Sequence, residues 1–179
     1  MFRERQRDAH GSSRECTIFT DDIVGSTASN VRLGDALYVE QLRVHDGLVR
    51  ARLREYGGRE IKHTGDGVNA AFADATDAVR CALAIQADID AWHRSEPDLA
   101  LQVRIGLAHG PVIPMAGDFF GLVQSQAARL CALASPGGLL ATGPVAGRLT
   151  AADVAIEPLG PHDLKGMPDA VEVYRLTAA

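Results

Sequence analysis

The elements that this sequence predicts indicate an α+β domain. Short runs rich in Ile, Val and Phe, bounded by Gly, Pro or Asp, predict strands. Two longer stretches repeat apolar residues three and four positions apart, which is typical of amphipathic helices. In chain order the elements run strand, helix, strand, strand, helix, strand, with further strands behind them. This order predicts a ferredoxin-like βαββαβ core with a C-terminal extension.

The first strand and helix are predicted to follow one another directly. The strand is expected at residues 16–20, an apolar run that ends shortly before Asp22. A long helix is expected over residues 26–56, because leucine and valine recur at helical spacing and Gly57 and Gly58 follow. The carboxyl end of the strand therefore opens into the first helix.

A hairpin and a second helix come next. Glycines flank Asp66, and short strand-like runs lie on both sides of it at residues 60–62 and 68–72. This pattern predicts a tight hairpin with Asp66 at its tip. Asp74 is then expected to cap a helix whose apolar face fades near Pro97.

The second half of the chain completes the sheet. A central strand is expected at residues 99–107, and a short strand at 112–113 after a turn at Gly110 and Pro111. A helix is expected at residues 119–133. The remaining strands are expected at residues 139–142, 154–158 and 171–176.

Composition limits the classes of protein that fit. The chain has 179 residues, of which 46% are hydrophobic and 23% charged, which suits one globular domain. We expect this domain at residues 16–179, behind a mobile polar tail at residues 1–15, and we expect no regulatory domain. The net charge is −5 and no basic stripe is present, which argues against nucleic-acid binding. No stretch suits a signal peptide or a membrane span, so we expect a cytoplasmic protein without membrane contact. Cys16, Cys81 and Cys131 are widely spaced, which predicts reduced, mostly buried thiols.

Two aspartates beside turns predict a metal and phosphate site. Asp22 ends the first strand, and Gly25, Ser26 and Thr27 can open a helix whose free N–H groups face an anion. Asp66, at the hairpin tip, can approach Asp22. Hard cations such as Mg²⁺ take oxygen ligands and keep positions for substrate phosphates, so the pair predicts a two-metal site. Either motif alone is more often a helix cap or a plain turn.

Six separated segments carry a resemblance to a known family. They are residues 22–27 (Asp-Ile-Val-Gly-Ser-Thr), 62–67 (Lys-His-Thr-Gly-Asp-Gly), 103–110 (Val-Arg-Ile-Gly-Leu-Ala-His-Gly), 117–121 (Gly-Asp-Phe-Phe-Gly), 127–130 (Ala-Ala-Arg-Leu) and 164–166 (Leu-Lys-Gly). In this order, over residues 16–176, the chain resembles the class III nucleotidyl cyclases, specifically the bacterial adenylyl cyclase catalytic domain. Six segments in register make coincidence very unlikely.

The resemblance implies a reaction and a composite site. A nucleoside triphosphate would become a 3′,5′-cyclic monophosphate with release of pyrophosphate, at the interfaces of a head-to-tail homodimer that binds two Mg²⁺ or Mn²⁺ ions. One chain would supply the metal ligands Asp22 and Asp66, with Arg104 and the backbone amides of Ile23, Val24, Gly25, Ser26 and Thr27 for the phosphates. The partner would supply Lys62 and Asp118 for the base, Ser125 and Arg129 for the reacting centre, and Lys165 for the terminal phosphates.

The residues placed at the base favour ATP as the substrate. Adenine offers an acceptor at N1 and a donor at its 6-amino group, which complement an ammonium such as Lys62 and a carboxylate such as Asp118. Guanine reverses both polarities, and a mismatched buried polar group causes strong rejection.

The chain departs from the family pattern at three positions. Ser125 stands where an asparagine is usual, although its hydroxyl still donates and accepts hydrogen bonds. Asp21 stands where a small or neutral residue is usual, and strand alternation aims it away from Asp22, so we expect it not to be a metal ligand. Thr20 stands where an aromatic residue is common, with Phe19 displaced by one.

Two other functions remain open from the sequence. The departure at Ser125 favours a catalytically weak or inactive domain that binds nucleotide or a partner as a regulatory module. A diguanylate-forming or polymerase-palm-like domain also uses paired carboxylates, but the Gly-Gly-Asp/Glu-Glu-Phe hairpin typical of the former is missing here.

Overall fold

The computed structural model describes residues 13–115, 117–150 and 154–179. Its strands form one sheet with the order β2-β3-β1-β4-β6-β8-β7, and β5 pairs with β4. The strands are β1 Arg14–Ile23, β2 Arg59–His63, β3 Val68–Phe72, β4 Val103–Met115, β5 Asp118–Phe120, β6 Leu139–Thr142, β7 Val154–His162 and β8 Val171–Ala178. The helices are α1 Ser26–Leu33, α2 Asp35–Glu55, α3 Ala75–Ser95, the 3₁₀ turn η1 Pro97–Leu99, α4 Leu122–Leu133 and α5 Gly143–Ala146. The α+β class and the βαββαβ order with a C-terminal extension are confirmed.

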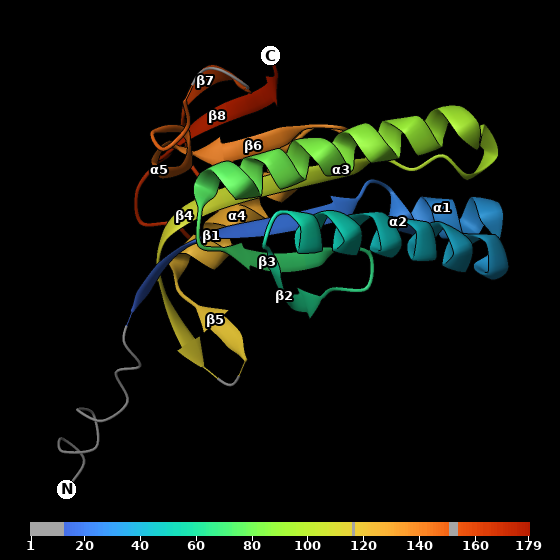
Figure 1. Ribbon diagram of the computed structural model, residues 1–179, viewed down its shortest axis with the longest axis horizontal. Coiled ribbons are helices and arrows are strands. Elements are labelled where there is room, and N and C mark those ends of the chain that lie inside the picture. The colour runs from blue at the N-terminus through green and yellow to red at the C-terminus, as the bar shows by residue number, and fades with distance from the viewer. Residues whose placement is uncertain (1–12, 116, 151–153) are drawn as a thin grey trace, which may run out of the picture.

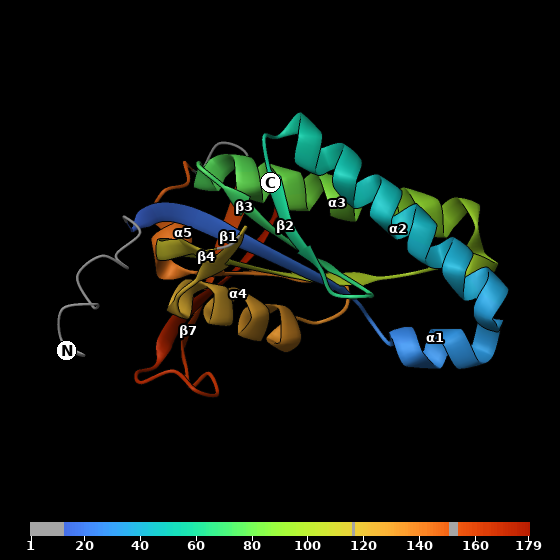
Figure 2. The same ribbon diagram turned by 90° about the horizontal axis from the view of Figure 1, so that it is seen from below.

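Helices cover both faces of the sheet (Figures 1 and 2). Helices α2 and α3 lie on one face, where Phe19 packs in the main core with Val49 and Ile85. Helix α4 lies on the opposite face, where Ile18 packs in a smaller cluster with Val123. Because neighbouring strand residues point to opposite faces, the displaced Phe19 faces the main core and leaves Thr20 on the α4 side. Among the described residues, no helix is long and apolar enough to cross a bilayer.

Several expected element boundaries are wrong. The central strand expected from residue 99 begins only at Val103, because Pro97–Leu99 form the 3₁₀ turn η1. The helix expected over residues 26–56 is two helices, because Gly34 adopts a φ of 75° between α1 and α2. The turn expected at Gly110 and Pro111 is part of β4, since the start of β1 pairs with β4 as far as Arg14 opposite Val112. The helix expected from residue 119 begins at Leu122, because residues 118–120 pair with the end of β4.

The N-terminal boundary is also earlier than expected. Residues 1–12 of the expected tail lie outside the described residues, and β1 already begins at Arg14. The predicted cap of the second helix is confirmed, because Asp74 Oδ1 accepts the backbone N–H of Thr76 at 2.6 Å and of Asp77 at 3.3 Å.

Helix α4 packs directly on the backbone of β4 at Gly106. A Cβ atom there would lie 2.2 Å from Ala127 O and 2.4 Å from Cys131 N. We expect Gly106→Ala to lower the free energy of unfolding by about 1–3 kcal/mol, because α4 must move away from the sheet. Urea denaturation followed by circular dichroism measures this change. Gly47→Ala is the matched control, since a Cβ at this position in α2 meets nothing within 4 Å and alanine favours a helix. Equal stability of Gly106→Ala and the natural protein would contradict the close packing.

Candidate active site

The structure brings Asp22 and Asp66 together. Asp22 lies near the end of β1, and Asp66 lies at the tip of the β2–β3 hairpin. The backbone N–H of Ile23, the residue after Asp22, donates to Asp66 O at 3.0 Å. The tip also contacts β1 closely, because a Cβ at Gly67 would lie 2.1 Å from Asp21 O. The hairpin therefore holds Asp66 against the strand end that carries Asp22.

Arg104 pairs with Asp22 across two strands. These two residues face each other in the β1–β4 register. Arg104 Nε and Nη2 donate to Asp22 Oδ2 at 2.8 and 2.6 Å, and Nη1 donates to Ala132 O at 3.1 Å. Beside this pair is a hollow of about 190 Å³, which Thr20, Thr64 and Ala128 also line. Arg104, expected to reach the phosphates, thus lies next to a predicted metal ligand, and its phosphate role stays a prediction.

The two aspartates fit a divalent cation. Asp66 Oδ2 accepts the hydroxyl of Ser26 at 2.5 Å and Asp22 Oδ2 accepts Arg104. Among the described residues, neither Oδ1 atom accepts a hydrogen bond, and no group of three or more His, Cys, Asp or Glu side chains gathers to hold a metal. Two carboxylates with unused oxygens suit hard cations that take their other ligands from phosphates and water.

The turn between β1 and α1 leaves fewer backbone amides free to bind an anion than expected. Ile23 N donates to Asp66 O, and Val24 N donates to Gln102 O at 2.9 Å. Both amides are thus engaged within the protein and are not available to a phosphate in this structure. Gly25, with a φ of 66°, begins α1 without a side-chain cap. The predicted anion site therefore narrows to the amides of Gly25, Ser26 and Thr27.

Lys62 and Asp118 come from strands that contact each other. Lys62 lies on β2 and Asp118 on β5, and the two strands pack together. The guanidinium of Arg59 lies 4.7 Å from the centroid of the Phe119 ring, which joins β2 to β5 by a cation–π contact. Asp118 Oδ1 accepts the backbone N–H of Phe119 at 2.7 Å. Nothing in the sequence singled out Arg59, because it is only one of several charged residues on β2.

Ser125, Arg129 and Lys165 lie on the exposed surface. Ser125 and Arg129 share one side of α4, as their spacing of one helical turn predicts. Lys165 lies between β7 and β8, beside Gly166 with a φ of 85°. Within the described part of the chain, no hydrogen bond or ion pair joins these three residues to Asp22 or Asp66.

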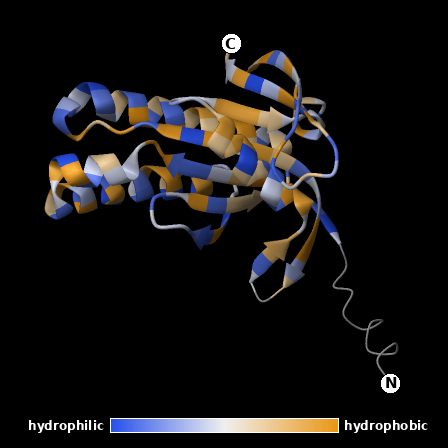
Figure 3. Cartoon of the chain, turned by 180° about the vertical axis from the view of Figure 1, so that it is seen from behind, coloured by the Kyte–Doolittle hydropathy of each residue, from blue (hydrophilic) through white to orange (hydrophobic). Residues whose placement is uncertain are grey.

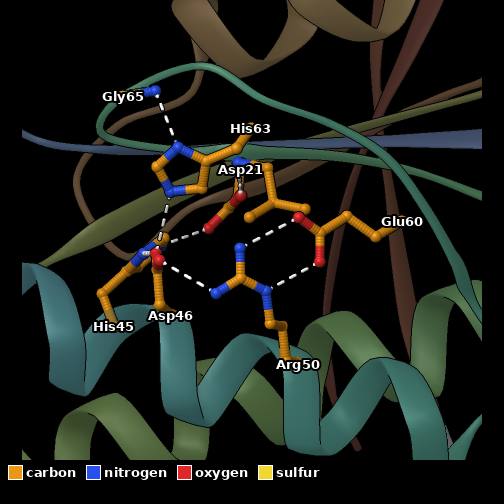
Figure 4. A network of polar contacts seen from close by, with 8 residues as sticks. Asp21, His45, Asp46, Arg50, Glu60, His63 and Gly65 are labelled. Carbon is orange, nitrogen blue, oxygen red and sulfur yellow. Dashed lines mark hydrogen bonds and ion pairs between the residues drawn. The ribbon is translucent and has the colours of Figure 1, made fainter.

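Asp21 belongs to a buried network that is separate from Asp22 and Asp66 (Figure 4). Its Oδ1 accepts Val68 N at 2.6 Å, and its Oδ2 lies 2.6 Å from Nε2 of His45 on α2. Both side chains are fully buried. His45 Nδ1 lies 3.2 Å from Asp46 Oδ1, so both ring nitrogens face carboxylate oxygens. Since carboxylates only accept, both nitrogens donate and the ring is positively charged.

The pKa of His45 agrees with this charge. Burial alone lowers the pKa of the imidazole, but the hydrogen bonds and charges of Asp21 and Asp46 outweigh it, so the pKa lies above its usual 6.5. The sequence analysis placed Asp21 away from Asp22, which the structure confirms, but it did not identify His45 as the partner.

The three cysteines are free thiols. Cys16, Cys81 and Cys131 are all buried and form no disulfide. Burial raises the pKa of Cys81 to about 12 and also raises those of Cys16 and Cys131. The thiols are therefore protonated and serve as small apolar side chains.

Comparison with known proteins places this geometry in a family. Residues 9–178 match the family model described as "Adenylate and Guanylate cyclase catalytic domain". An uncharacterised protein of Mycobacterium tuberculosis (strain ATCC 25618 / H37Rv) is 33% identical over 165 residues, which cover 92% of this chain and 42% of the relative. The chain spans less than half the length of the curated relatives that it matches.

Solved structures of both adenylyl and guanylyl cyclases share the fold. The adenylyl cyclase CyaB from P. aeruginosa superimposes with a TM-score of 0.85 at 20% identity, covering 94% of this chain and 96% of that one. The guanylate cyclase domain of RhGC from Catenaria anguillulae, in complex with GTP, superimposes with a TM-score of 0.81 at 22% identity, covering 92% and 96%. These two likenesses show the fold and do not choose between the bases. The family match over nearly the whole chain shows that this protein belongs to the class III adenylate and guanylate cyclase catalytic domains.

Proposed function

We propose that this chain, as a single catalytic domain over residues 16–179, converts ATP to 3′,5′-cyclic AMP and pyrophosphate at two composite sites of a head-to-tail homodimer. One observation carries the proposal. Asp22 and Asp66 meet at one place, whereas Lys62 and Asp118 lie on β2 and β5, which contact each other. Each of these pairs would form one half of a site, and a second copy would bring complementary halves together.

Exposed apolar side chains support the second copy. Ile113, Met115, Phe120 and Leu122 are 46–57% exposed along the β4–β5 hairpin and the start of α4. Figure 3 shows hydrophobic residues on both strands of this hairpin, which extends away from the sheet. Exposed apolar residues that lie next to one another are typical of an interaction surface. The group includes Met115, which faces Asp118 in the β4–β5 register, so a partner bound there would lie beside the proposed base site.

The side chains have separate tasks in the proposed reaction. Asp22 and Asp66 hold the cations, and Gly25, Ser26 and Thr27 bind phosphate oxygens through their amides. When bound, two Mg²⁺ or Mn²⁺ ions would lower the pKa of the ribose 3′-hydroxyl and neutralise charge on the triphosphate.

The partner chain would complete the chemistry. Arg129 would donate to the charge that develops on the α-phosphoryl oxygens, because a guanidinium stays protonated and presents a planar fork of donors. Lys165 would bind the terminal phosphates as a point charge. Ser125 would form a hydrogen bond at the ribose in place of an asparagine.

The base contacts give the first test. Lys62 would donate to adenine N1 and Asp118 would accept from the 6-amino group. We expect the purified protein to prefer ATP over GTP by about a hundredfold or more in kcat/KM, and Lys62→Met to lower kcat/KM for ATP by a similar factor. Chromatography of the cyclic products measures both. Arg54→Met, at an exposed position on α2, is the control for removal of a surface charge. Comparable formation of cyclic GMP by the natural protein would contradict the base assignment.

Ser125 supports one alternative, a nucleotide-binding module without turnover. A protein that binds ATP with Mn²⁺ but forms no cyclic product would establish it, and Ser125→Asn would then show whether the hydroxyl is the cause. The three free thiols support a reducing compartment, and we propose the cytoplasm as the location.

A further inference from the structure

The hairpin that carries Asp66 is tied to α2 by a side chain with no task in the proposed reaction. His63, the last residue of β2, lies with its Nε2 3.1 Å from Asp46 Oδ1 on α2. Its Nδ1 lies 3.1 Å from the backbone nitrogen of Gly65, the residue before Asp66 (Figure 4). A neutral imidazole has one donor and one acceptor. Nε2–H therefore donates to Asp46, and Nδ1 accepts the N–H of Gly65.

The anchor on α2 is itself held in place. Asp46 Oδ2 accepts Nη1 of Arg50 at 3.1 Å, and Arg50 also pairs with Glu60 at 2.7 and 3.0 Å. Asp46 Oδ1 additionally accepts from His45, whose other nitrogen faces Asp21. His63 thus contacts a carboxylate that two other side chains, Arg50 and His45, already hold in place.

The contacts of His63 with Asp46 and Gly65, here called the tether, act on the tip of the hairpin. Gly65 has a φ of 103° and is exposed, and the backbone bond from Thr64 N to Gly67 O at 2.9 Å closes the tip around it. On the far side of the tip, Val68 N donates to Asp21 Oδ1. His63 is the corresponding restraint on the near side. Hydrogen bonds at Gly65 and at Val68 therefore flank Asp66 in the chain, in addition to the bonds that Asp66 itself accepts from Ile23 N and the Ser26 hydroxyl.

We propose that His63 is a positioning residue, which orients Asp66 for the divalent cations by tying the hairpin tip to Asp46. It acts through Gly65 and has no contact with substrate. This inference rests on the proposed function, since it requires that Asp66 holds a cation. Alternation along β2 places Lys62 on the opposite face from His63, so the tether and the base contact are separable.

The experiment compares three variants for metal binding and hairpin opening. Binding of Mn²⁺ in the presence of 3′-deoxy-ATP is measured from the loss of the free-ion electron paramagnetic resonance signal. We expect His63→Ala to weaken Mn²⁺ binding about tenfold, the size of effect seen when a partner of a metal ligand is removed. Amide hydrogen exchange at residues 64–68 is expected to become faster in the same variant. His63→Gln should restore part of both properties, because its side-chain amide can also donate through its NH2 group and accept through its carbonyl oxygen.

His93→Ala provides the control. This histidine is exposed on α3, and its removal is expected to change neither measurement. Mn²⁺ binding by His63→Ala equal to that of the natural protein would overturn the inference, as would a loss of thermal stability with unchanged metal binding. If the natural protein itself binds no Mn²⁺ with the analogue, the proposed function fails. In that case, amide hydrogen exchange at residues 64–68 that is the same in His63→Ala as in the natural protein would show that His63 does not restrain the hairpin tip. Faster exchange in His63→Ala would support the restraint.

Discussion

Two inactive variants are expected to regain activity when mixed. Asp22→Ala removes a proposed metal ligand and Lys62→Ala removes a proposed base contact, so each homodimer should lose activity by about a hundredfold or more. In a mixed dimer, one of the two sites combines the intact Asp22 of one chain with the intact Lys62 of the other. When equal amounts are mixed, about half of the dimers contain one chain of each variant, and each such dimer has one intact site of two. Activity should therefore return to about a quarter of the natural level. Cyclic AMP formation before and after mixing measures this.

A second pair of variants controls this experiment. Asp22→Ala and Asp66→Ala both alter the proposed metal half of the site, so no arrangement of the two chains would restore an intact site. Their mixture is expected to stay inactive. Recovery there, or its absence in the first mixture when mixed dimers are shown to form, would contradict the assignment of the two halves to different chains.

The second large effect is expected at His45. His45→Ala leaves the fully buried Asp21 without its cationic partner, and removal of one member of a buried ion pair costs about 3–5 kcal/mol. Urea unfolding at pH 6 measures the loss. The double variant Asp21→Asn/His45→Gln is the control, because two neutral amides can keep a hydrogen bond without a buried charge. The double variant should be more stable than His45→Ala, and the opposite order would contradict a charged pair.

The same pair predicts how stability depends on pH. The folded pKa of His45 lies above its unfolded value of 6.5, so folding favours the protonated ring. This contribution is complete below pH 6.5 and is lost as the pH rises through the folded pKa. The natural protein should therefore lose more stability between pH 6 and pH 9 than His45→Gln does. Parallel curves for the two proteins would show that His45 is not charged in the fold.

Local patterns predicted the fold class because the residues that favour a turn or cap a helix act within their own segment of the chain. The glycines around Asp66 favour a hairpin, and Asp74 caps a helix, whatever surrounds them. Boundaries that depend on distant pairing were missed. The turn expected at Pro111 is extended because β1, almost a hundred residues earlier in the chain, pairs with this segment. Long-range pairing of this kind leaves no trace in a local window.

The candidate site was predicted unevenly for the same reason. Motif positions indicated both aspartates, and the structure places them together. The occupied amides of Ile23 and Val24 could not be foreseen, because their acceptors lie on other strands and loops. His45 did leave a pattern. Gln41, His45, Val49 and Leu53 form one buried stripe on α2, and a histidine inside such a stripe requires a buried hydrogen-bond partner elsewhere in the chain, here Asp21.

The β2–β3 hairpin has a consequence for the dimer as a whole. It carries Lys62 and Asp66, which the proposed arrangement assigns to opposite catalytic centres. In the proposed dimer, a nucleotide bound to Lys62 in one centre would therefore also act on the hairpin loop that positions Asp66 in the other centre. The two centres would then communicate without any rearrangement of the sheet, and saturation by ATP would deviate from a simple hyperbola.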